Sequence, residues 1–295
     1  MIVDQRDDMN YEKNTAIYNF MAPVFLILSF WVMIKKIIFG KDIDTNIFFI
    51  DGMSLPCRKL KENAANYLAL DILYNHKFGY DKSYSGRAAD FFLGMVNGQA
   101  MRNRLKMVGQ CLREEIDHLI ASGSEVRIFS IASGSAQGVI NLLSEYMKKN
   151  ITIQAQLLDL DASALENAKI TAKKFNVLNQ LAFINKNARE ADGYIKKFNP
   201  NIIEIVGFLE YRPDDRVIAL ARRMRSLLGP GGVFLTSTVT PSMESYFLTH
   251  VSNWPMIYRD VEGFAKMVRQ FGFDDCEIIC EPLKLQKIAI CRVIK

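Results

Sequence analysis

The chain has 295 residues, of which 49% are hydrophobic and 23% charged, as in an ordinary globular protein of one large domain or one domain plus a cap. Its net charge of +5 is spread along the chain, which excludes the basic stripe of a nucleic-acid-binding protein. Five cysteines without a Cys-x-x-Cys pair and three histidines argue against a disulfide framework and a structural zinc site, so we expect a cytoplasmic protein without a metal.

The N-terminal region holds a long stretch without charge, from Asn14 to Ile34. Its length is compatible with a membrane span, but Pro23 and two asparagines would be costly in lipid without partners. Acidic residues precede it and no small-residue cleavage site follows, which excludes a secretory signal. Three interpretations stay open: a buried or lid helix, a helix at a membrane interface, and a true span.

The first 121 residues predict a helical cap without repeats. We expect a polar arm, then one or two apolar helices divided or kinked near Pro23, and a short apolar piece. An amphipathic helix, a Tyr-, Gly- and Ser-rich loop and two further helices follow. In chain order these predictions cover residues 1–13, 14–39, 48–55, 58–75, 78–86, 88–98 and 99–121.

Residues 122–295 alternate between strand and helix patterns, which predicts a doubly wound α/β domain with a mainly parallel, seven-stranded, Rossmann-like sheet. The last two strands can close the sheet as a hairpin. We expect strands at 126–131, 151–158, 181–184, 202–206, 233–239, 275–281 and 286–293, and helices at 136–149, 162–175, 214–228 and 261–271.

The first predicted strand ends in a small-residue turn that contains Gly134 and Gly138 and leads into a helix. Glycine there lets the polar atoms of a ligand approach the main chain closely. The next strand ends in Asp159, about 21 residues beyond Gly138, where nucleotide-binding folds place an acid that binds ribose hydroxyls. The alternative is a glycine turn in an arbitrary α/β domain.

Five motifs follow one another in this region: Ser-Ile-Ala-Ser-Gly-Ser-Ala-Gln-Gly at 130–138, Leu-Leu-Asp-Leu-Asp-Ala-Ser-Ala-Leu-Glu-Asn-Ala at 157–168, Phe-Ile-Asn-Lys-Asn-Ala at 183–188, Val-Gly-Phe-Leu-Glu-Tyr at 206–211 and Leu-Leu-Gly-Pro-Gly-Gly-Val-Phe at 227–234. In their order, over residues 126–295, they resemble class I S-adenosylmethionine-dependent methyltransferases. The resemblance implies S-adenosyl-L-methionine as cofactor, with Asp159 on the ribose, Leu160 beside the adenine and Asn187 accepting from the adenine amino group. The other residues it implies are Ser133, Gly134, Ser135, Gly138, Ala188, Gly207 and Phe208.

Two further matches narrow the resemblance. Segments 84–90, 100–104 and 254–259 are similar to a bacterial subgroup proposed to make 3-hydroxy fatty acid methyl esters. Segment 18–25 resembles the opening of many small-molecule methyltransferases, in which this helix folds over the cofactor, although Phe25 replaces the usual tyrosine. The chain also departs from the family at Ser130, where an acid is common, so the grip on the cofactor's amine is expected to be altered.

Methyl transfer from a sulfonium needs positioning and exclusion of water more than a nucleophilic side chain. A carboxylate acceptor needs no base, and its orienting residues would be among Arg102, Arg104, Tyr211 and Arg259; the alternative for each arginine is a salt bridge between cap and core. For a hydroxyl or amine acceptor His250 is the candidate base, unless it is a plain surface histidine. Glu210 is either a base or a helix-start carboxylate.

The sequence therefore predicts a methyltransferase acting on a small, lipophilic or carboxylate-bearing metabolite, with no nucleic-acid partner and with peripheral membrane contact open for 14–34. A cyclase that consumes the same cofactor and releases methylthioadenosine is the first alternative. A non-catalytic, membrane-associated scaffold is the second.

Overall fold

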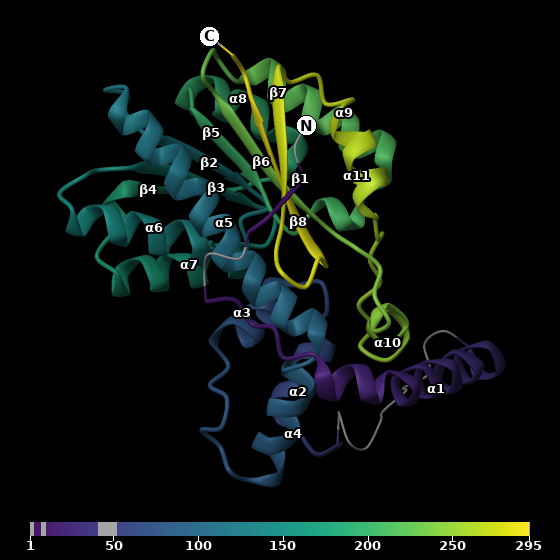
Figure 1. Cartoon of the computed structure of the whole chain (residues 1–295). Helices are drawn as coiled ribbons and strands as arrows, with labels where there is room; N and C mark the ends of the chain where they lie inside the picture. The colour runs from purple at the N-terminus through teal and green to yellow at the C-terminus, as the bar shows by residue number, and fades with distance from the viewer. Residues whose placement is uncertain (1–2, 7–9, 41–51, 295) are drawn as a thin grey trace.

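The computed structural model describes residues 3–6, 10–40 and 52–294 and is built around one mixed eight-stranded sheet (Figure 1). The strand order is β1-β7-β8-β6-β5-β2-β3-β4. The strands are β1 (Val3–Gln5), β2 (Arg127–Ile131), β3 (Gln154–Asp159), β4 (Leu181–Asn185), β5 (Ile202–Ile205), β6 (Val233–Val239), β7 (Asp275–Cys280) and β8 (Gln286–Arg292).

Seven strands lie where the sequence predicts them, and the expected hairpin is β7–β8, which pairs antiparallel. Because β8 also pairs antiparallel with β6 while the other neighbours are parallel, the sheet is mixed. The predicted number of seven strands is wrong by one, since part of the expected polar arm forms β1 beside β7. An added strand satisfies the backbone groups that β7 would otherwise expose at the sheet edge.

Alternating side chains of the strands bury two separate apolar clusters, one on each face, as a doubly wound sheet requires. In β2, Ile128 packs into the cluster shared with α5 (Val96–Ala121), α6 (Gln137–Lys148) and α7 (Ala162–Lys174). Its neighbour Phe129 packs into the cluster on the opposite face. Three helices cover that face: α8 (Ala191–Phe198), α9 (Asp214–Leu227) and α11 (Val261–Val268).

A third apolar cluster joins the N-terminal helices to α10 (Ser245–His250). The helices are α1 (Ala16–Phe39), α2 (Leu55–Glu62), α3 (Tyr67–Asn75) and α4 (Tyr84–Leu93). Helix α5 belongs to two clusters, because Met101 packs with these helices and Leu112 packs against the sheet. The division into a cap at 1–121 and a cofactor domain at 122–295 stays a prediction.

One helix prediction in this region is wrong, and for another the structure decides between two alternatives. The helix expected at 58–75 is interrupted, because Ala65 takes a left-handed conformation (φ 63°) and Asn66 then caps α3 through its side chain. Of the one or two helices expected at 14–39, the structure has one: α1 is continuous through Pro23, which removes one backbone donor without dividing the helix. Half of the apolar piece expected at 48–55, residues 48–51, lies outside the described residues, and its last residue, Leu55, begins α2.

Candidate active site

A cavity of about 490 Å³ opens at the carboxyl ends of β2, β3 and β5. Ligands of open α/β sheets bind at this edge, and the volume is within the usual range for small-molecule sites. All ten residues predicted to contact the cofactor line it: Ser133, Gly134, Ser135, Gly138, Asp159, Leu160, Asn187, Ala188, Gly207 and Phe208.

The turn between β2 and α6 holds its backbone in an unusual conformation. Gly134 has φ 55°, and two alanines beside it, Ala132 and Ala136, are also left-handed at φ 52° and 50°. Left-handed alanines cost free energy and occur mostly where a functional geometry requires them. A Cβ on Gly134 would stand 3.3 Å from the Cβ of Tyr67 across the cavity, so the glycine keeps this narrow part open.

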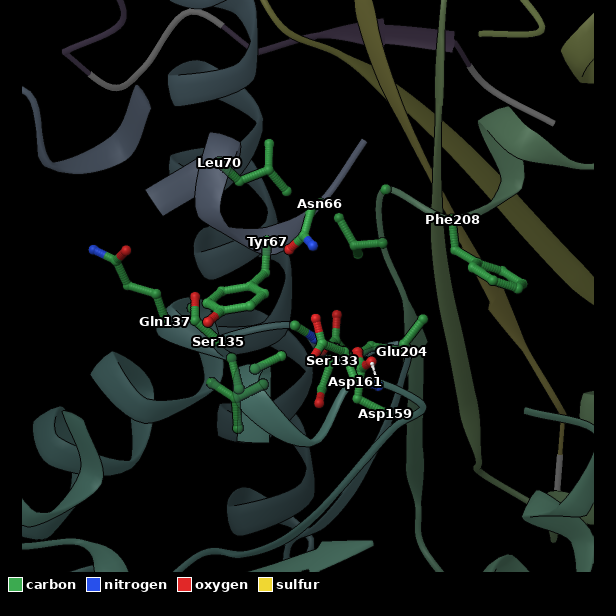
Figure 2. A pocket seen from close by; sticks show the side chains of 18 of the residues that line it. Asn66, Tyr67, Leu70, Ser133, Ser135, Gln137, Asp159, Asp161, Glu204 and Phe208 are labelled. Carbon is green, nitrogen blue, oxygen red and sulfur yellow. Dashed lines mark hydrogen bonds between the residues drawn. The ribbon is translucent and has the colours of Figure 1, made fainter. Parts of the chain in front are cut away.

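Asp159 lies at the end of β3, half-buried, and is held by two backbone donors. Its Oδ2 accepts from the N–H of Gly134 at 2.7 Å, and its Oδ1 accepts from the N–H of Asp161 at 2.8 Å. Figure 2 shows its side chain in a group with those of Ser133, Asp161 and Glu204. The glycine turn and the acid therefore form one rigid unit, although they are 25 residues apart.

Glu204 also lines the cavity, and the sequence analysis did not single it out. It stands on β5 opposite Ser130 of β2, and the Ser130 hydroxyl donates to its Oε1. Burial raises the pKa of the Glu204 carboxyl. A carboxylate thus lies beside the serine that replaces the family's usual acid. A charged residue inside the apolar run Ile202–Val206 was the signal in the sequence.

The wall made by α5 carries a buried ion pair that is incompletely hydrogen-bonded. Arg104 donates to Glu210 at 3.2 Å, to Tyr74 at 3.3 Å and to Gln286 at 3.4 Å, and its Nε has no partner among the described residues. The Glu210 Oε2 and the Gln286 Nε2 are likewise buried and unpartnered there. Burial raises the pKa of the Glu210 carboxyl despite the neighbouring guanidinium. Glu210 is therefore neither an exposed helix-start carboxylate nor a freely accessible base.

Tyr211 lies beside this pair and also lines the cavity. Its hydroxyl accepts from the indole N–H of Trp254 at 2.6 Å, and burial raises its pKa to about 12. The phenol thus stays protonated at neutral pH and can donate a hydrogen bond toward a ligand.

Three other residues that the sequence analysis proposed for the acceptor site do not line the cavity: Arg102, Arg259 and His250. Arg259 is buried and donates to Asp214 and to two carbonyls of the 209–212 segment, so it holds the segment that carries Glu210 and Tyr211. Arg102 forms a two-pronged pair with Glu12. Both arginines form salt bridges, but each bridge stays within its own region, whereas the predicted bridge between cap and core is made by Arg104 with Glu210.

His250 ends α10, away from the cavity lining, and its ring stacks on Tyr246. Burial and the nearby Lys36 lower its pKa. This position gives no support to a role as the base.

Asn187 lines the cavity but is already engaged in its own helix cap. Its side-chain oxygen accepts from the N–H of Arg189 at 3.0 Å, and Glu190 completes the capping box. The amide oxygen has a second lone pair, so an adenine amino group remains a feasible additional donor.

Helix α3 also lines the cavity, next to α5, and was not assigned to the site from the sequence. Figure 2 shows Asn66 and Tyr67 on the side of the cavity next to Ser133 and Ser135, and Leu70 of α3 also lines the cavity. Helix α1, predicted by resemblance to fold over the cofactor, contributes no residue to the cavity lining. Its Phe25 packs instead against Phe91 of α4 and Phe247 of α10.

The family model described as "Putative methyltransferase" matches residues 62–292. The chain belongs to this methyltransferase family. A search of curated proteins finds no match to this methyltransferase.

Among solved structures, a possible exported protein from Bordetella parapertussis is similar to this chain. The two sequences are 16% identical, and the match covers 96% of this chain and 100% of that chain with a TM-score of 0.65. That likeness shows a shared fold.

A SAM-dependent methyltransferase from Thiobacillus denitrificans, in complex with S-adenosyl-L-homocysteine, is 22% identical. The structural match covers 59% of this chain and 64% of that chain, with a TM-score of 0.41.

Proposed function

We propose that this methyltransferase uses S-adenosyl-L-methionine and methylates a small acceptor that carries a carboxylate. The observation that carries the proposal is the rigid unit of Asp159 and the glycine turn at the edge of the cavity. The fixed carboxylate can bind the two ribose hydroxyls of the cofactor, and the glycine turn lets the cofactor's polar methionine part approach the main chain closely.

The residues present fit this cofactor. Gly134 leaves room that a Cβ would narrow, and the buried Ser133 hydroxyl has no protein partner among the described residues, so it is available to a ligand. Asp159 would hold the ribose hydroxyls and Leu160 would flank the adenine. When bound, the cofactor supplies a methyl group made electrophilic by a positive sulfur.

Glu204 would bind the ammonium group of the cofactor's methionine part. It lies within the cavity lining, and Ser130 fixes its Oε1. A carboxylate held in place in a site of low dielectric attracts a cation more strongly than one in water does. Glu204 would thereby replace the acid missing at Ser130.

The acceptor would bind on the α5 wall. A carboxylate there would accept hydrogen bonds from the incompletely paired Arg104 guanidinium and from the Tyr211 hydroxyl. Both residues line the cavity. Such a nucleophile needs no base, so these residues would act by orienting the attacking oxygen and excluding water.

An apolar part of the acceptor also has a place. Trp254 lines both the main cavity and a smaller, mostly apolar one of about 50 Å³ between α2, α5 and α10. A lipophilic carboxylate therefore suits the site best, and 3-hydroxy fatty acids are one such class.

Two measurements test the proposal. Calorimetry with S-adenosyl-L-methionine should give a single tight site, and absence of binding would overturn it. Incubation with labelled cofactor and cell extract should release S-adenosyl-L-homocysteine and label an organic-extractable product. Methylthioadenosine as the nucleoside product would show a cyclase instead, and label confined to protein or RNA would overturn the small acceptor.

A further inference from the structure

We propose that the outer face of α1 binds the surface of an anionic lipid bilayer, with the helix lying in the plane of the membrane. Eleven of the 23 exposed large apolar side chains among the described residues belong to this one helix. They include Phe20, Ile27, Phe30, Trp31, Ile34 and Ile38, which are between 39% and 82% exposed. Monomeric soluble proteins rarely expose so much contiguous apolar surface.

The exposed residues form one face rather than a scatter. The buried residues of α1 are Tyr18, Ala22, Phe25, Ser29 and Val32, spaced three or four apart, so they form a single stripe. The exposed apolar side chains occupy the opposite side along the whole helix, whose 24 residues span about 36 Å. The mean hydropathy of α1 reaches 2.0, and only 28% of its most apolar window is buried, whereas a core helix would be mostly buried.

The packing of α1 favours a helix that lies on the membrane over one that spans it. Phe25 contacts rings of α4 and α10, and the Tyr18 hydroxyl donates to the Phe91 carbonyl at 3.1 Å. At the other end, the Lys36 ammonium donates to the His250 carbonyl at 3.0 Å and to Asn253 at 2.7 Å. A span would have to break all of these contacts, whereas an interfacial helix keeps them.

The positive charge at the C-terminal end of α1 favours an anionic bilayer over a neutral one. Helix α1 contains no acidic residue, and Lys35 and Lys36 lie in its last turns. Lys61 of α2 is close enough to contribute, with burial, to the lowered pKa of Lys36. The Lys35 ammonium lies 3.6 Å from the ring centroid of Trp31. An indole with cations beside it suits the headgroup region of an anionic bilayer.

The experiment is flotation of the full chain with vesicles of phosphatidylcholine containing phosphatidylglycerol, against phosphatidylcholine alone. The chain should float with the anionic vesicles, and less so at high salt. Ile27→Glu should lower the vesicle-bound fraction at least about tenfold, because it places a charge on the exposed face that would contact the acyl chains of the bilayer. The matched control is Ile170→Glu on α7, since Ile170 is 61% exposed and Ile27 68%. It should bind like the unaltered chain.

Lys35→Glu should reduce the preference for anionic over neutral vesicles. Equal binding of Ile27→Glu and Ile170→Glu would overturn the proposal, as would a chain that never floats. A dimer that Ile27→Glu dissociates, without vesicle binding, would show that the face pairs two copies instead. Calorimetry with S-adenosyl-L-methionine on Ile27→Glu should be unchanged, which separates this test from the proposed function.

Discussion

The two walls of the cavity differ in how completely their polar groups are paired. On the strand side, Asp159 accepts two backbone hydrogen bonds of 2.7 and 2.8 Å, and Ser130 fixes Glu204. On the α5 side, the bonds of Arg104 measure 3.2 to 3.4 Å, and buried atoms of Arg104, Glu210 and Gln286 lack partners among the described residues.

This difference indicates two kinds of ligand contact. The strand side is preorganised, since its acceptors are fixed before anything binds, which suits a ligand that is the same in every turnover. Buried polar atoms are normally hydrogen-bonded, so the unpartnered atoms on the α5 side have hydrogen-bonding capacity available for a ligand. This difference supports the proposal that the cofactor binds on the strand side and the acceptor on the α5 side.

The largest expected effect is on the α5 side. Arg104→Leu leaves the Glu210 carboxylate buried without its counter-charge, which should lower the free energy of unfolding by about 3–5 kcal/mol. Chemical denaturation measures this. The double variant Arg104→Leu/Glu210→Leu should recover most of the loss, whereas Arg216→Leu, at an exposed arginine of α9, should cost little. A loss as small as that of Arg216→Leu would contradict the buried pair.

The next effect tests the strand side. Asp159→Ala should weaken binding of S-adenosyl-L-methionine by about 30- to 150-fold, because charge-assisted hydrogen bonds to the ribose contribute about 2–3 kcal/mol. Calorimetry gives the dissociation constant. Asp215→Ala, at an exposed aspartate, is the control and should leave it unchanged. Equal affinities of the two variants would place the cofactor elsewhere.

Two glycines with the same φ allow the effect of backbone strain to be distinguished from the effect of a side chain inside the cavity. Gly207 and Gly123 both have φ 73°, so alanine at either should cost about 1 kcal/mol of stability. A Cβ at Gly207 would lie 3.2 Å from Arg104 Nη2, whereas one at Gly123 meets nothing within 4 Å. Turnover should therefore fall in Gly207→Ala alone. An equal loss of turnover in both variants would mean that strain, not the cavity, is responsible.

The smallest effect concerns pH. Because burial raises the pKa of Glu204, the folded chain holds that proton more tightly than the unfolded chain, and stability falls as pH rises from the usual range through the raised pKa. Glu204→Gln removes this loss, so its Tm should exceed that of the unaltered chain by about 2–4 °C at pH 8 and by less at pH 4.

The same Glu204→Gln variant should bind the cofactor more weakly, since the carboxylate for its ammonium group is gone. Glu166→Gln, at an exposed position of α7, should change neither quantity. A Tm difference that does not depend on pH would contradict the raised pKa.

The sequence by itself determined the sheet's strands, the glycine turn and the acid at Asp159. These features are local: alternation of apolar residues, a small-residue turn and the residue that ends a strand can each be recognised within a short window. Since parallel strands bring their carboxyl ends to one edge, the ten predicted cofactor residues could be grouped without knowing the packing.

Only the tertiary structure decided which charged residues meet. Arg104, Arg259 and His250 look alike as candidates in sequence, but one lines the cavity, one braces a neighbouring segment and one lies away from it. Glu204 lies in the site because it faces Ser130 on the neighbouring strand, although the two residues are 74 positions apart in the sequence. Such pairings depend on long-range register and helix docking, which a local pattern does not encode. For α1, too, only the structure shows which residues form the buried stripe and which form the exposed face.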